Sequence, residues 1–298
     1  MNAKRTKSTT RERLTVNKTY KLFIGGGFPR SESGRIFAVP GADGTPIANA
    51  CLASRKDLRA AVEAARKAQS GWAGRTPYNR GQILYRIAEV SESRSSELVG
   101  ELVASGMTKA AAETEVGLSI DRWVWYAGWC DKYLQVLGGA NPVSGPYFNF
   151  SLVEPTGVVG VVAPDESPLL ALVSRMAPAL VPGNTVVALA SETAPLVAIT
   201  LAEILATSDV PGGVVNLLTG NRDELVPWMA DHADVNSIDV SGADDDLVAE
   251  AQRRASATVK RVVRPSPEER QWASTTAESP FVIESFTETK TVWHPIGR

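Results

Sequence analysis

Between residues 157 and 265 the chain alternates short apolar runs, rich in valine and isoleucine, with longer segments of helical periodicity. A continuous β-branched run is typical of a parallel strand that is buried on both faces. Strands that alternate with helices at this spacing predict an α/β fold built on a doubly wound parallel sheet. The predicted strands are "GVVGVVAP" (157–164), "NTVVALA" (184–190), "VVNLLTG" (214–220), "NSIDVSG" (236–242) and "KRVVRP" (260–265).

The residues that precede this region predict strands followed by helices. Residues 20–54 alternate short apolar runs with glycine and proline turns, which is typical of strands and hairpins. Three segments carry apolar residues at helical spacing: 55–74, 79–106 and 110–137. We therefore expect an N-terminal part over 20–137, a β-hairpin over 138–156, and the parallel sheet over 157–265.

The two ends of the chain are more polar than its centre. Residues 1–19 predict a solvated, disordered tail, and a tether to an acidic partner is the alternative. The basic residues behind this alternative are Lys4, Arg5, Lys7, Arg11 and Arg13. Residues 266–280 are low in aliphatic side chains and predict a linker. Residues 281–298 then predict a strand with no hairpin partner next to it in sequence, so it must pair with a distant strand or with another chain.

Composition argues against several classes of function. Hydrophobic residues make up 44% of the chain and charged residues 21%, which is ordinary for a soluble globular protein. A formal net charge of -2 gives no sign of a nucleic-acid or anionic-membrane partner. No apolar run reaches the roughly 20 residues that a membrane span needs, and the basic N-terminus has no apolar core behind it as a signal peptide would. We expect a cytoplasmic protein.

Cysteine and histidine are too scarce for several kinds of site. The chain has two cysteines, Cys51 and Cys130, and two histidines, His232 and His294. Two distant cysteines predict neither a disulfide framework nor a metal cluster, and they suit a reducing compartment. A histidine-based metal site or a serine triad is not expected, and we predict no metal ligands.

Several ordered blocks resemble the aldehyde dehydrogenase superfamily. They cover roughly residues 20–265 and 281–293, and they include "EPTGVVGVVAP", "MAPALVPGNTVV", "GVVNLLTG" and the final "ESFTETKTVW". The resemblance implies a Rossmann-type cofactor domain with N-terminal helices. It also implies that the 138–156 hairpin and the last strand form a β oligomerisation arm, which in the family extends the sheet of a neighbour's catalytic domain.

The chain departs from the family where the chemistry would take place. The family follows its first strand with Trp-Asn, and that Asn donates to the developing oxyanion; here the two positions hold Asp165 and Glu166. An ionised carboxylate accepts hydrogen bonds and repels negative charge, so Glu166 would oppose such an intermediate. The two carboxylates are also a poor acid/base pair, because adjacent residues in an extended segment point apart.

The cofactor motifs are retained only in part. By resemblance, the residues placed for NAD or NADP are Pro164, Glu192, Gly220, Ser241 and Gly242. The family's ribose-binding Lys is replaced by Leu189, and loss of one charged hydrogen bond weakens a ligand by roughly ten- to a hundredfold. For Gly220 and Gly242, turn geometry alone is an equal explanation. We therefore expect NAD or NADP binding to be weak if it occurs at all.

The largest departure is a missing segment. After "KRVVRP" the family continues into Glu-Leu-Gly-Gly-Lys and a catalytic domain that bears the nucleophilic Cys and the general-base Glu; here residues 266–280 lead directly to the last strand. No cysteine follows Cys130, which lies in a tryptophan-rich helix and is expected to be packed in the core. We predict no catalytic residues.

These observations leave three functions to weigh. The chain is expected to be a catalytically inactive subunit that assembles with a full-length aldehyde dehydrogenase, through the 138–156 hairpin and the 281–297 strand, as a structural or regulatory partner. The alternatives are an active NAD(P)-dependent aldehyde dehydrogenase and a module that senses NAD(P) weakly.

Overall fold

A five-stranded parallel sheet forms the centre of the molecule. The computed structural model describes residue 14 and residues 16–297, so the basic residues at positions 4–13 lie outside the described part. The strand order is β10-β9-β6-β7-β8, and every pairing is parallel. The strands are β6 (Val158–Val162), β7 (Thr185–Leu189), β8 (Val215–Leu218), β9 (Ser237–Asp239) and β10 (Arg261–Val263). All residues of β6 to β9 are buried, and the predicted doubly wound parallel sheet is confirmed.

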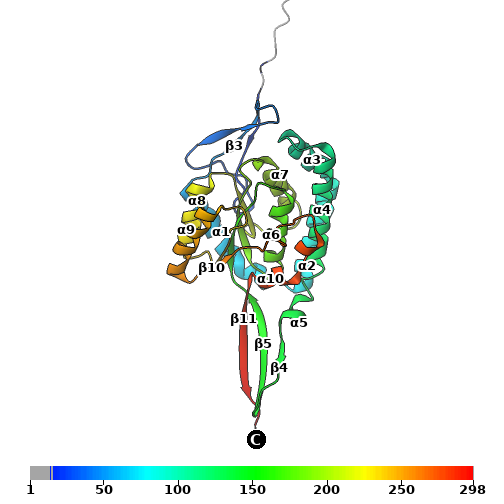
Figure 1. Ribbon diagram of the computed structural model, residues 1–298, viewed down its shortest axis with the longest axis vertical. Helices are drawn as coiled ribbons and strands as arrows, with labels where there is room; N and C mark the ends of the chain where they lie inside the picture. The colour runs from blue at the N-terminus through cyan, green and yellow to red at the C-terminus, as the bar shows by residue number, and fades with distance from the viewer. Residues whose placement is uncertain (1–13, 15, 298) are drawn as a thin grey trace, which may run out of the picture.

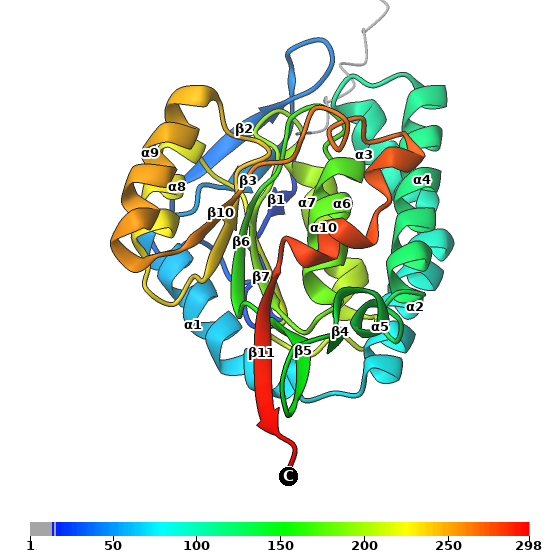
Figure 2. The same cartoon turned by 60° about the horizontal axis from the view of Figure 1, so that its bottom comes forward.

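Helices cover both faces of this sheet (Figures 1 and 2). One face carries α1 (Arg55–Ala73), α8 (Arg222–Asp231) and α9 (Asp245–Ala255). The other face carries α6 (Leu170–Leu180) and α7 (Pro195–Ala206). Outside these two lie α2 (Pro77–Ser93), α3 (Ser95–Ala104) and α4 (Lys109–Ala127), which pack on α6 and α7. The helices α6 and α7 are apolar almost all round because they are buried between the sheet and this outer layer.

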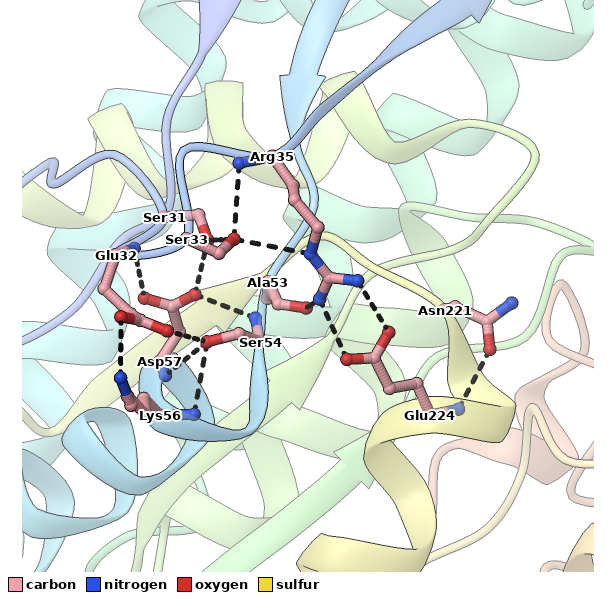
Figure 3. Close-up of polar contacts among 10 residues, drawn as sticks. All are labelled: Ser31, Glu32, Ser33, Arg35, Ala53, Ser54, Lys56, Asp57, Asn221 and Glu224. Carbon is pink, nitrogen blue, oxygen red and sulfur yellow. Dashed lines mark hydrogen bonds and ion pairs between the residues drawn. The ribbon is translucent and has the colours of Figure 1, made fainter.

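The N-terminal strands are fastened to the start of α1. A small sheet of order β1-β3-β2 contains β1 (Thr19–Tyr20), β2 (Ile36–Pro40) and β3 (Pro46–Cys51). Ser54 and Asp57 form a capping box at the start of α1. Figure 3 shows that the same Asp57 carboxylate also accepts hydrogen bonds from the Ser31 hydroxyl and the Glu32 backbone N–H, at 2.7 and 3.0 Å. One buried acid thus satisfies both the helix end and the loop before β2.

A three-stranded antiparallel arm projects from the body and carries the C-terminus near its tip (Figure 1). Its order is β11-β5-β4, with β4 (Gly139–Asn141), β5 (Tyr147–Pro155) and β11 (Thr287–Pro295), and it follows the short helix α5 (Tyr133–Leu137). All nine residues of β11 pair with β5. The last strand, which has no partner next to it in sequence, therefore pairs within its own chain.

The segment between β10 and β11 differs from its prediction. Residues 266–280 are not a detached linker: Trp272 is buried at 4% exposure, and the segment contains the 3₁₀ turn η2 (Thr275–Ala277). The predicted strand from residue 281 starts as the helix α10 (Pro280–Glu284) instead, because Ser279 caps it and Pro280 occupies the first helical position. The predicted tail also ends early, since Thr19 already pairs with Asn49.

Candidate functional site

A crevice lies at the carboxyl edge of the parallel sheet, between the ends of β6 and β9. The chain runs from β6 outward to β7 and β8 on one side, and later fills β9 and β10 on the other. Such a reversal of strand order is where open α/β sheets bind ligands. Here the crevice has a volume of about 280 Å³ and is lined by the loops that follow β6, β7, β8 and β9.

The structure brings three of the five predicted cofactor residues to this crevice: Glu192, Ser241 and Gly242. Gly220 lies in a neighbouring hollow of about 210 Å³, which Glu192 also lines. Pro164 lines neither hollow, although its nitrogen lies close behind Gly242.

Both glycines are explained by close packing. A Cβ on Gly242 would lie 2.2 Å from the Ala163 carbonyl oxygen, and the Gly242 N–H donates to the Val162 carbonyl at 2.9 Å. A Cβ on Gly220 would lie 2.9 Å from a methyl group of Leu225. The ends of β6 and β9 can approach each other at Gly242 only because this position has no side chain, whereas a side chain at Gly220 would mainly displace the flexible end of Leu225.

Asp165 is the centre of the polar contacts in the crevice. Its carboxylate accepts hydrogen bonds from the Ser191 hydroxyl at 2.7 Å and the Glu192 backbone N–H at 2.9 Å. Both terminal nitrogens of Arg222 donate to it, at 2.8 and 2.7 Å. Burial by itself would raise the pKa of Asp165, but the hydrogen bonds from Arg222 and Ser191 outweigh it and lower the pKa below the usual aspartate value.

Arg222, which follows β8, contacts residues at the ends of β6 and β7. Its Nη2 also donates to the Ala163 carbonyl at 2.7 Å, and its backbone N–H donates to the Glu192 carboxylate at 2.7 Å. Sequence reasoning missed this arginine. Its only signal is a charged residue directly after the β8 turn, and nothing in the sequence names Asp165 as its partner.

Glu166, which follows Asp165 in the sequence, has a different arginine as its partner. Glu166 lies 3.4 Å from Arg270, which also donates to the Ser241 carbonyl at 3.0 Å. Asp165 and Glu166 thus face different arginines, so they do not form an acid/base pair. Because Arg270 belongs to the segment between β10 and β11, this segment crosses the edge of the crevice.

The predicted cofactor hydroxyl already has a partner. The Ser241 hydroxyl donates to the Asp239 carboxylate, which also accepts a hydrogen bond of 2.7 Å from Arg175 Nε. Arg175 and Asp239 are both fully buried, so loss of either partner would leave the other as an uncompensated buried charge.

Neither cysteine is placed for catalysis. Cys51 ends β3 and is fully buried, while Cys130 lies between α4 and α5 at 1% exposure. Burial raises the pKa of the Cys130 thiol to about 12, so it carries no thiolate near neutral pH. In the part of the chain that the structure describes, no group of three or more acidic, cysteine or histidine side chains is arranged to hold a metal ion. Within the same residues, no helix combines the length and apolarity needed to cross a bilayer.

Comparison with known proteins now identifies the family. The model of the aldehyde dehydrogenase family matches residues 28–264, which end with the last strand of the parallel sheet. The chain belongs to the aldehyde dehydrogenase family. The putative aldehyde dehydrogenase DhaS of Bacillus subtilis is 34% identical over 260 residues, which are 85% of this chain and 52% of that relative. The cytosolic 10-formyltetrahydrofolate dehydrogenase of Xenopus tropicalis is 37% identical over 239 residues, which are 77% of this chain and 26% of that protein.

Solved aldehyde dehydrogenase structures share the fold. The NAD+ complex of the Bacillus cereus enzyme superposes with a TM-score of 0.77 at 28% identity, and covers 83% of this chain and 50% of the other. HpcC of Thermus thermophilus superposes with a TM-score of 0.79, also at 28% identity, over 83% and 48%. The chain therefore spans about half the length of these two structures and of DhaS, and about a quarter of the Xenopus tropicalis relative. It passes from β10 to β11 through residues 264–286 alone.

Proposed function

We propose that this chain is a non-catalytic subunit that assembles with a complete aldehyde dehydrogenase. Covalent aldehyde oxidation in this family depends on an activated thiol and a donor for the oxyanion. The chain's two thiols are buried away from the crevice, and the donor position holds Glu166. These features favour a role in assembly over a role in turnover.

The arm is the observation that carries the proposal. Its surface exposes large apolar side chains on two strands: Tyr147 and Phe148 at 42% and 50%, Leu152 at 48%, and Trp293 at 59%. In the described residues, β11 pairs with β5 on one side and with no strand on its outer side. Three of these side chains lie on the central strand β5, and Trp293 lies on the edge strand β11. Exposed apolar side chains beside an unpaired strand edge favour coverage by another chain.

The chain has the β arm of the family but no catalytic domain between β10 and β11, and this combination indicates the kind of partner. The family resemblance implies that such an arm extends the sheet of a neighbour's catalytic domain. Between β10 and β11 this chain offers no catalytic domain to a second copy of itself. A complete family member would provide the missing surface, and the aromatic side chains of the arm are the kind that dominate binding at interfaces.

Co-purification tests the proposal. A tagged copy of the chain, expressed with a complete aldehyde dehydrogenase from the same cells, is expected to retain that enzyme through size-exclusion chromatography. A monodisperse homo-oligomer with no retained dehydrogenase would contradict the proposal. Reduction of NAD+ or NADP+ by the purified chain with an aldehyde would contradict it independently, and would favour the active-enzyme alternative.

A further inference from the structure

We propose that the crevice at the carboxyl edge of the sheet is closed by the chain's own side chains and admits neither NAD nor NADP. The aldehyde dehydrogenase fold implies a dinucleotide at this edge, but the residues present here do not fit one. The proposal concerns the crevice alone, so it stands or falls separately from the partner of the arm.

The first closure is the ion pair between Asp165 and Arg222. Two parallel hydrogen bonds of 2.8 and 2.7 Å join them across the ends of β6 and β8. Such bidentate pairs are the strongest and most directional of the charged contacts. Only 12% of the Arg222 side chain is exposed, because the Ala163 carbonyl and the loops around it enclose the guanidinium.

The second closure comes from the segment between β10 and β11. Arg270 donates to the Ser241 carbonyl and lies within ion-pair distance of Glu166, so it spans the side of the crevice that β9 forms. Arg122 anchors this segment further along, by donating to the backbone oxygens of Trp272 and Ala277 at 2.9 and 3.3 Å. The crevice is therefore bounded by a fixed part of the body.

Three polar groups at this edge already have partners within the chain. Glu192, which the resemblance assigns to a ribose, accepts the Arg222 backbone N–H. The Gly242 N–H donates to Val162, and the Asp244 side chain caps the first turn of α9 by accepting from Leu247 N–H. Rows of free N–H donors are what bind phosphates at helix N-termini, and here the Leu247 N–H in the first turn of α9 is already capped from within the chain.

The charge of the crevice also opposes a pyrophosphate. Two guanidinium groups face five carboxylates, which is an excess of three negative charges: Asp165, Glu166, Glu192, Asp223 and Asp244 against Arg222 and Arg270. Phosphates are bound where positive charge and N–H donors converge.

Calorimetry tests whether the crevice is closed to dinucleotides. Titration of the full chain with NAD+ and with NADP+ up to millimolar concentration is expected to give no saturable heat. Saturable binding of either nucleotide would overturn the proposal, whatever the arm binds.

Chemical labelling of Arg222 tests whether its ion pair with Asp165 closes the crevice. Phenylglyoxal modification of Arg222, followed by mass spectrometry, is expected to be slow in the wild type relative to the exposed Arg253, whose side chain is 71% exposed. In Asp165→Asn the rate at Arg222 should rise about tenfold, the effect of losing roughly one charge-assisted hydrogen bond. The matched control is Asp223→Asn, which removes the same charge from the same crevice without touching the Asp165–Arg222 pair, and it should leave the rate unchanged.

Two labelling results would overturn the proposal that the Asp165–Arg222 ion pair closes the crevice. An equal rise in both variants would make the effect one of bulk charge, and an unchanged rate in folded Asp165→Asn would mean that the ion pair does not hold Arg222. Circular dichroism establishes that each variant is folded before it is labelled.

Discussion

Arg122, at the core-facing side of α4, donates its Nη2 hydrogen to the backbone oxygen of Trp272 at 2.9 Å. The arginine is 1% exposed, and its other nitrogens donate to Ser174, Ala277 and Glu278. One buried cation therefore holds the segment that joins the parallel sheet to the arm. The strand β11 itself is held by its nine pairings with β5, so this contact fixes residues 272–278 rather than the arm.

Replacement of this anchor should destabilise the chain. In Arg122→Met the buried partner oxygens and Glu278 lose their donor, which is expected to cost about 3 kcal/mol of unfolding free energy. Hydrogen exchange should increase first in residues 266–279. Arg264→Met is the control, because Arg264 pairs with the exposed Asp245 at the surface and should change stability by less than about 0.5 kcal/mol. Equal effects of the two variants would show that Arg122 is not an anchor.

Two carboxylates in the polar network of Figure 3 should differ in how much they contribute to the free energy of unfolding: Asp57 should contribute more than Glu224. Asp57 is 5% exposed and accepts from Ser31, Glu32 and Ser54, so Asp57→Ala leaves several buried donors unpaired and should cost about 3 kcal/mol. Glu224→Gln breaks a surface pair with Arg35 and should cost less than about 1 kcal/mol. Urea denaturation of both variants measures the difference, and a larger loss in Glu224→Gln would contradict this ranking.

Glu115 should give the stability a dependence on pH. Its buried carboxylate accepts from the backbone N–H groups of Leu169 and Leu170 at the start of α6. Burial raises its pKa above the usual glutamate value, and these two hydrogen bonds offset the rise only in part.

A raised folded-state pKa contributes stability that is full below the unfolded value and is lost as the pH rises through the folded value. Glu115→Gln keeps an acceptor without the charge, so it should lack this decline, and the stability of the wild type relative to the variant should fall as the pH rises through the window. Thermal unfolding from about pH 4 to pH 8 compares the two. Parallel curves would mean that the carboxyl is not perturbed in the folded protein.

Both thiols should be unreactive toward thiol reagents in the folded protein. Cys51 and Cys130 are buried, and the pKa of Cys130 is raised to about 12. A thiol reagent at neutral pH should modify neither residue until denaturant unfolds the chain, because only the exposed thiolate reacts. Rapid stoichiometric labelling of either cysteine in the folded chain would contradict this prediction and would favour a role for that thiol in catalysis.

The arm should lose its partner when its tryptophan is removed. Trp293→Ala is expected to weaken retention of the aldehyde dehydrogenase by about 2 kcal/mol, or roughly thirtyfold, as loss of an aromatic hot spot does. Phe281→Ala is the matched control, since Phe281 is exposed to 63% against 59% for Trp293 but lies in α10. Similar retention of the enzyme by both variants would remove the arm from the proposal.

The sequence was most informative where structure depends on local pattern. The valine-rich runs predicted all five parallel strands, and the spacing of apolar residues predicted α1 and the helices of the outer layer. It was least informative at residues 266–280, because their low aliphatic content says nothing of the two contacts, from Arg122 and from Arg270, that hold a polar segment against the body.

The candidate site divides in the same way. The residues that end each strand could be listed from the sequence, since carboxyl ends of parallel strands share one edge. Their partners could not, because Arg222 and Asp165 are 57 positions apart and Arg122 and Trp272 are 150 positions apart. Hydrophobic periodicity is a property of neighbours along the chain, and it determined the sheet and its buried strands. Which charges meet is decided only when strand ends and loops converge in space, and that convergence paired Asp165 with Arg222 and left the apolar side chains of the arm exposed.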